Sequence, residues 1–107
     1  MQMSGFDKRE EAFESKFAHD EEILFRILAR AKLTTGLWAA EKLGKTGAAA
    51  EEYAKALLTQ DVAGNLKFGV LAQIQKDFDA AGVVQSEHQI ARHFEEFKAQ
   101  ATKAVKG

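Results

Sequence analysis

Three residues in the middle of the chain, Gly44-Lys45-Thr46, match the end of a phosphate-binding loop. In that loop the backbone N–H groups and the lysine hold phosphate oxygens, and another glycine stands five residues before the second one. This chain has Ala39 there, and residues 37–43 have the pattern of a helix interior. The three residues are therefore better explained as the end of a helix, where glycine is common.

The histidines and serines form no set with the spacing of a metal site or of a nucleophile and its base. His19, Asp20 and Glu22 are close in sequence, but Asp20 is better interpreted as a helix N-cap, with His19 at a junction. His88 and His93 are five residues apart and so point to different faces of a helix. No histidine and acid accompany the serines in a recognisable arrangement: Ser4, Ser15 and Ser86. We expect no metal site and no enzymatic activity.

The composition is that of one helical domain. The 107 residues include no proline, no cysteine and only 8 glycines, with 46% apolar and 29% charged residues. This composition argues against a β-sandwich and excludes disulfides and thiolate metal sites. A net charge of −1 gives no strong attraction to nucleic acid, and no apolar run approaches the roughly 18 residues of a membrane span. We expect a cytoplasmic protein that does not insert into the membrane.

Glycine positions and capping residues predict four helices with short connections, and hence a compact all-α four-helix bundle. The first helix should be long, because neither glycine nor proline occurs from Phe6 to Thr35, and it should end near Leu43, because Gly44 and Gly47 follow. The second should begin after Thr46 or Gly47 and end at Gly64. The remaining signals are Asn65 as the N-cap and Gly82 as the end of the third helix, and a capping box of Ser86 with Gln89 at the start of the fourth.

Each predicted helix has an apolar face that should form the core. In the first helix the face lies within about 40° of one line and is made of Phe6, Phe13, Phe17, Leu24, Leu28 and Ala31, widened by Ile23, Ile27, Leu37, Trp38 and Leu43. The second contributes Ala50, Tyr53, Ala54, Leu57 and Leu58, with Val62 as a further candidate. The third and fourth contribute Leu66, Val70, Leu71, Ile74, Phe78, Ile90, Phe94, Phe97, Ala101 and Val105. Trp38 and Tyr53 are expected in the core rather than against a ligand.

The residues before Asp20 differ from the rest of the first helix. A helix of about 13 residues is marginal alone, and its acidic pairs at i and i+4 repel: Asp7 with Glu11, and Glu10 with Glu14. Its apolar face consists almost wholly of Phe6, Phe13 and Phe17. Two interpretations are open: the rings dock on the bundle as the start of one continuous helix, or they bind a groove of a partner protein.

Charge alternates along the chain. Residues 1–22 carry three bases and seven acids, a net charge of −4, whereas residues 23–46 carry five bases and one acid, a net charge of +4. A solvated helix face explains such a pattern. A weak phosphate-binding strip is the alternative, made of Arg26, Arg30, Lys32, Lys42 and Lys45.

Four stretches of the chain form a recognisable set. The longest is Gly36-Leu37-Trp38-Ala39-Ala40-Glu41-Lys42-Leu43-Gly44-Lys45-Thr46-Gly47. The others are Phe17-Ala18-His19-Asp20-Glu21-Glu22, Ala29-Arg30 and Tyr53-Ala54. Together these stretches resemble the ζ subunit, or ATPase-inhibitor, family of alphaproteobacterial F-type ATP synthases. The chain departs from the basic, Asn-containing stretch usual before Gly36, since it has Ala31-Lys32-Leu33-Thr34-Thr35 there.

The resemblance implies a four-helix domain, residues 20–107, with an inhibitory segment, residues 1–19, that is weakly ordered and mobile in the free protein. In the family this segment inserts into the catalytic sector of the ATP synthase and reversibly blocks ATP hydrolysis. On this chain we map its buried anchors to Phe6, Phe13 and Phe17. Ion pairs with acidic groups of the partner fall to Arg9 and Lys16, and pairs with basic groups fall to Glu10, Glu11 and Glu14.

The resemblance also implies a regulatory subunit without a cofactor, monomeric when free and peripheral at the inner membrane through the ATP synthase. An alternative function remains open: a non-inhibitory nucleotide-sensing or assembly module that docks on the same enzyme. That module would bind ATP or ADP weakly at the basic strip.

Overall fold

The computed structural model describes the backbone of residues 2–106 and the side chains of residues 20–106. It contains four helices, in the order α1 (Gln2–Lys42), α2 (Gly47–Val62), α3 (Gly69–Ala81) and α4 (Glu87–Lys106). No strand occurs within residues 2–106. The prediction of an all-α chain with four helices is therefore confirmed.

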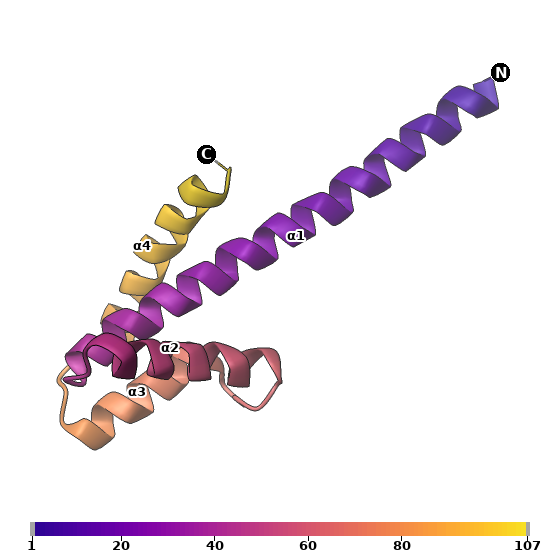
Figure 1. The fold of residues 1–107 in the computed structure, drawn as a ribbon. Helices are drawn as coiled ribbons and strands as arrows, with labels where there is room; N and C mark the ends of the chain where they lie inside the picture. The colour runs from indigo at the N-terminus through magenta and orange to yellow at the C-terminus, as the bar shows by residue number, and fades with distance from the viewer. Residues whose placement is uncertain (1, 107) are drawn as a thin grey trace.

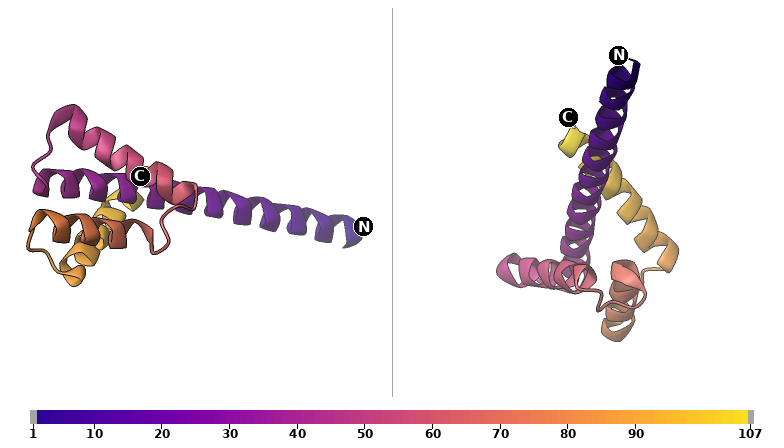
Figure 2. Two further views of the ribbon diagram at one scale, coloured as in Figure 1. Left: turned by 90° about the horizontal axis from the view of Figure 1, so that it is seen from below. Right: turned by 90° about the vertical axis from the view of Figure 1, so that its right-hand side faces the viewer.

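α1 is one helix of 41 residues, and only its C-terminal half lies among the other helices (Figure 1). The two views of Figure 2 agree that the indigo part of α1 extends away from α2, α3 and α4. This projection accounts for the elongated dimensions of the molecule, 68 × 28 × 27 Å. The expected weak order and mobility of residues 1–19 lie outside what the structure describes, and with the domain boundary after residue 19 they stay predictions.

α1, α2 and α3 end in the same way. At each end a glycine has a left-handed backbone, with φ of +82° at Gly44, +78° at Gly64 and +74° at Gly82. The N–H that follows each glycine donates to a carbonyl five residues back, at 2.9 Å: Lys45 to Ala40, Asn65 to Gln60, and Val83 to Phe78. Glycine adopts this conformation without a steric penalty, so the last carbonyls of each helix are satisfied. The predicted ends of these three helices are confirmed.

The start of α4 matches the sequence prediction, whereas the start of α3 does not. The N–H of Ser86 donates to Oε1 of Gln89 at 2.8 Å, and the N–H of Gln89 donates to Oγ of Ser86 at 3.1 Å. α3 was expected to follow Asn65 directly, but it begins at Gly69. Gly69 has a φ of +89°, and a right-handed helix cannot pass through such a residue. The prediction of Asn65 as the N-cap is therefore wrong.

α1 and α2 pack closely because α1 carries a glycine at their contact. A Cβ atom on Gly36 would lie 3.0 Å from both Cα and Cβ of Ala54, which is closer than an ordinary carbon contact. Next to it, the fully buried Thr35 donates from Oγ1 to the carbonyl oxygen of Ala31 at 2.7 Å. A glycine inside a helix costs about 1 kcal/mol in propensity. Here the close approach of the two backbones explains its presence.

The core consists of two clusters of buried side chains. The larger draws on all four helices and contains Ala39, Leu57, Val70, Ile74, Phe78 and Ile90. The smaller joins α1 to α4 and contains Ile27, Ala31 and Ala101, with Ile23, Phe94 and Val105 packed against it. The first cluster therefore closes the bundle, and the second holds α4 along the middle of α1.

Within the described residues, all predicted core side chains but two are buried or half-buried. Trp38 and Tyr53 pack against the larger cluster, as expected. Val62 is 65% exposed, because it is the last residue of α2. Leu24 is 54% exposed, although it lies on the same predicted face as Leu28 and Ala31. For these two residues the prediction of burial is wrong, since position on a helix face does not reveal where the neighbouring helices end.

Candidate functional site

The first half of α1 carries the residues predicted to bind a partner. At about 1.5 Å per residue, a continuous helix places Phe6 roughly 21 Å from Asp20, in the part that extends away from the bundle (Figure 2). The predicted contact residues all lie on this part: Phe6, Arg9, Glu10, Glu11, Phe13, Glu14, Lys16 and Phe17. Their side chains lie outside the described residues, so their individual roles stay predictions.

The basic strip predicted from the sequence does not form one cluster. Arg26 lies 2.8 Å from Glu22, and Lys32 lies 2.6 Å from Asp61, each in an ion pair. At about 100° per residue, Lys42 points roughly 160° around α1 from Arg26. Arg30 is exposed on α1, and Lys45 lies in the turn after it. Phosphate binding by these residues stays a prediction.

Lys45 borders a surface groove of about 510 Å³ between the end of α1, the start of α2, and α4. Its apolar walls include Trp38 and Phe97, but its rim also carries the carboxylates of Glu41 and Glu51. The N-cap of α2, Thr46, makes no side-chain capping hydrogen bond, so N–H groups are left at that end. The two carboxylates oppose a phosphate there by their charge, which makes only weak anion binding reasonable.

The histidines of the described part are placed for packing or for solvent. The ring of His93 stacks on Trp38, with centroids 4.3 Å apart and an angle of 27° between the planes. Nδ1 of His93 lies 4.0 Å from a carboxylate oxygen of Glu96, and His88 is exposed. Among residues 20–106 no three acidic or histidine side chains gather as metal ligands. His19, one of the weighed ligands, lies outside the described side chains.

Tyr53 and Asp77 link α2 to α3. The hydroxyl of Tyr53 donates to Oδ2 of Asp77 at 2.6 Å, and Nε2 of Gln73 donates to the other carboxylate oxygen at 3.0 Å. Burial raises the pKa of Tyr53 well above its ordinary value, and the hydrogen bond and the negative charge of Asp77 raise it further. The pair is a structural contact, because it keeps the phenol protonated rather than preparing it for reaction.

Replacement of Tyr53 by Phe tests this contact through its pH dependence. A phenol whose pKa is raised in the folded state stabilises the fold below the unfolded value of 10.0, and this contribution is lost as the pH rises above it. We expect Tyr53→Phe to cost about 1 kcal/mol near pH 7 and progressively less above about pH 10. The measurement is thermal unfolding of both proteins near pH 7 and above about pH 10. The difference between the two proteins isolates the effect of Tyr53, the only tyrosine of the chain. An identical pH dependence of the two would contradict the assignment.

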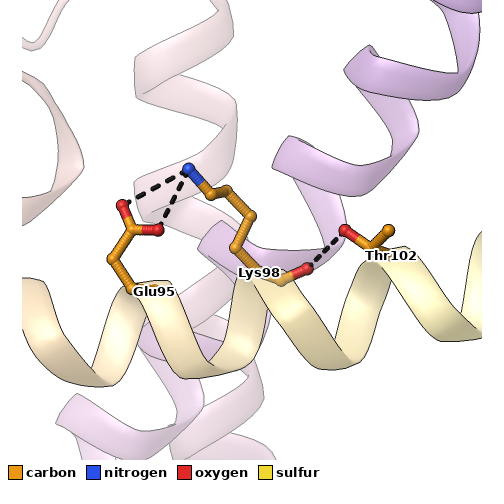
Figure 3. A network of polar contacts seen from close by, with 3 residues as sticks. All are labelled: Glu95, Lys98 and Thr102. Atoms are coloured by element: carbon orange, nitrogen blue, oxygen red, sulfur yellow. Dashed lines mark hydrogen bonds and ion pairs between the residues drawn. The ribbon is translucent and has the colours of Figure 1, made fainter.

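The polar contacts of Glu95, Lys98 and Thr102 on α4 are local (Figure 3), and the side chains of the ion pair are 37% exposed at Lys98 and 63% exposed at Glu95. Nζ of Lys98 lies 3.1 Å from Oε2 of Glu95, and Oγ1 of Thr102 donates to the carbonyl oxygen of Lys98 at 2.8 Å. The same ammonium lies 5.8 Å from the centre of the Phe94 ring. Exposed pairs of this kind contribute at most about 1 kcal/mol, so they support α4 and form no reactive centre.

Sequence reasoning missed the contacts that join separate helices. These are the ion pair of Lys32 with Asp61, the stack of Trp38 with His93 and the hydrogen bond of Tyr53 to Asp77. No local signal marks such pairs, because each joins residues far apart in the chain.

The described residues thus present a helical domain with a projecting helix, and no helix among them has the length and hydropathy to cross a membrane. No curated protein sequence matches the chain. The family model described as ATPase inhibitor subunit zeta matches residues 3–104, which confirms the resemblance found in the sequence. That description is one of a regulatory subunit that inhibits an ATPase. The chain therefore belongs to the ATPase inhibitor subunit zeta family.

Proposed function

We propose that this chain reversibly inhibits F-type ATP synthase by inserting residues 1–19 at a subunit interface of the catalytic sector. The observation that carries the proposal is the course of α1, whose first half extends away from the bundle (Figure 2). A helix in that position reaches a neighbouring protein without any rearrangement of the core. Membership of a family described as ATPase inhibitors supports the kind of target.

The sequence of the segment supplies the anchors for such a contact. Phe6, Phe13 and Phe17 share one helix face, and each contributes about 1.5–3 kcal/mol if fully buried. Charged residues surround that face and select the orientation through pairs at the rim: Arg9, Lys16, Glu10 and Glu14. Aromatic anchors within a charged rim are typical of a helix that binds a groove.

Inhibition follows from binding one conformation of the interface better than the others. An interface that opens and closes during each catalytic cycle stops when a wedge stabilises one of its states. A shift of a two-state equilibrium from 1:99 to 99:1 needs a preference of about 5.5 kcal/mol. Burial of two or three phenylalanine side chains is of that size. Nucleotide contact is therefore unnecessary for inhibition.

Release follows from the same energetics. Any part of the segment that becomes ordered only on contact costs free energy, which weakens the affinity and permits dissociation when the enzyme runs toward synthesis. The four-helix domain holds the segment at the enzyme. The proposal also includes the state of the chain. It is a monomer when free, and a cytoplasmic subunit, peripheral at the inner membrane, when bound to the enzyme.

The double variant Phe13→Ala with Phe17→Ala tests the proposal. We expect it to inhibit ATP hydrolysis by the cognate catalytic sector at least about tenfold more weakly than the natural chain, because two buried anchors are lost. The measurement is the steady-state hydrolysis rate as a function of added chain. Phe68→Ala is the matched control, since Phe68 is 79% exposed and lies outside the segment.

Unchanged potency of the double variant would remove the two rings as anchors. A hydrolysis rate that does not respond to the natural chain would instead favour the alternative of a non-inhibitory docking or nucleotide-sensing module.

A further inference from the structure

Two adjacent apolar side chains lie uncovered where α1 leaves the bundle. Leu24 is 54% exposed and Phe25 is 62% exposed, and we call these two residues the junction patch. The other large exposed hydrophobic side chains of the described part lie singly at a helix end or in a connection between helices: Val62, Phe68 and Val84. Single exposed hydrophobics are common, whereas contiguous exposed apolar surface is typical of an interaction site.

The patch is uncovered because the neighbouring helices cover other parts of α1. α4 packs on the flank formed by Ile23 and Ile27, through Ala101 and Val105. α2 ends at Val62, one residue after Asp61, which pairs with Lys32. Since Lys32 lies seven residues after Phe25, α2 stops about 10 Å short of the patch. Within the bundle, therefore, neither α2 nor α4 supplies a partner for both side chains.

The patch continues the phenylalanine face of the segment before it. Leu24 follows Phe17 by seven residues, which on a continuous helix places the two within about 20° of the same line. Phe25 lies about 80° around the helix from that line and widens the face where α1 meets the bundle. A surface that receives Phe17 therefore lies within about 10 Å of Leu24 along the helix axis.

We propose that the junction patch is the last part of the inhibitory contact and is buried against the rim of the same catalytic-sector interface. This inference rests on the proposed function of the N-terminal segment. The partner surface is an apolar rim flanked by basic groups, because the exposed acids Asp20 and Glu21 lie one helical turn before Leu24 and Phe25. Contact at the rim fixes how deeply the segment enters and holds the bundle beside the enzyme.

The double variant Leu24→Ala with Phe25→Ala tests the inference in the full chain. Alanine is the best helix former and both positions are exposed, so α1 and the thermal unfolding midpoint should be preserved. We expect inhibition of ATP hydrolysis to weaken by about tenfold or more. The control is Phe68→Ala with Val84→Ala, which shortens two apolar side chains that are 79% and 93% exposed on other parts of the bundle and should leave potency unchanged.

The other outcomes each overturn the inference in a recognisable way. If the patch variant inhibits as well as the natural chain while Phe13→Ala with Phe17→Ala does not, the inference fails and the proposed function stands. If the patch variant melts many degrees lower, the two side chains belong to the core. If the control variant weakens inhibition equally, the effect is not specific to the junction. If the natural chain does not inhibit, both proposals fall together.

Discussion

Deletion of residues 1–19 should abolish inhibition of ATP hydrolysis and leave the thermal unfolding of the remaining chain nearly unchanged. Among the described side chains, every buried core residue lies at Ile27 or later. Three contacts that join α1 to its neighbours, at Lys32, Gly36 and Trp38, lie later still. Ile23, which packs against the smaller core cluster, also lies outside the deletion. The deletion therefore removes the proposed wedge without removing a core contact among those that the structure describes.

The shortened helix should also begin well. Asp20 would stand at its N-terminus as a capping residue, followed by Glu21 and Glu22, whose charges interact favourably with the helix dipole. The two measurements are a circular dichroism melt of both proteins and the hydrolysis rate of the catalytic sector with each of them added. A melting point many degrees lower in the shortened chain would show that the phenylalanine rings dock on their own bundle.

Replacement of Phe78 by Ala should have the opposite pair of effects. Phe78 is fully buried in the larger core cluster, and its ring lies edge-on to Trp38 with centroids 5.7 Å apart. Loss of such a side chain costs about 3–5 kcal/mol. For a domain of this size that corresponds to a melting point lower by more than about 10 °C. A surface change such as Phe68→Ala should stay within about 0.5 kcal/mol.

At a temperature at which the Phe78→Ala variant is still folded, its inhibition should stay within a few-fold of the natural chain. The proposed segment is the first half of α1, whereas the core packs against its second half. A cavity at Phe78 in α3 therefore does not change the surface of the segment. Thermal melts locate the temperature, and hydrolysis assays below it give the potency. Loss of inhibition by the folded variant would mean that the core of the bundle contributes to the contact with the enzyme.

The helices and most of their ends could be predicted from the sequence because their causes are local. The left-handed glycines Gly44, Gly64 and Gly82 end three helices where expected, and Ser86 with Gln89 caps the fourth. The one wrong start, at Asn65, is also local in origin. Asn65 has the side chain of a good N-cap, but Gly69 has a positive φ, a backbone angle that glycine permits but does not require.

The candidate site was predictable only in part. The spacing of Phe6, Phe13 and Phe17 defines an apolar face from the sequence alone, and the family match over residues 3–104 agrees with the resemblance that indicated its function. The five basic residues predicted as one strip are not all accounted for by their positions on one helix. Lys32 pairs with Asp61 on another helix, and no pattern along one helix reveals a partner that lies 29 residues away.

The order of the residues is sufficient to predict that this chain forms four helices, where most of them end, and that one apolar face runs along the first helix. Backbone conformation and helix periodicity depend on neighbouring residues, so the sequence contains them directly. The packing of the helices is needed to explain why this face is buried at Ala31 and exposed at Leu24. The reason is that burial depends on where α2 and α4 stop alongside α1, which is a property of the packed helices rather than of any one of them.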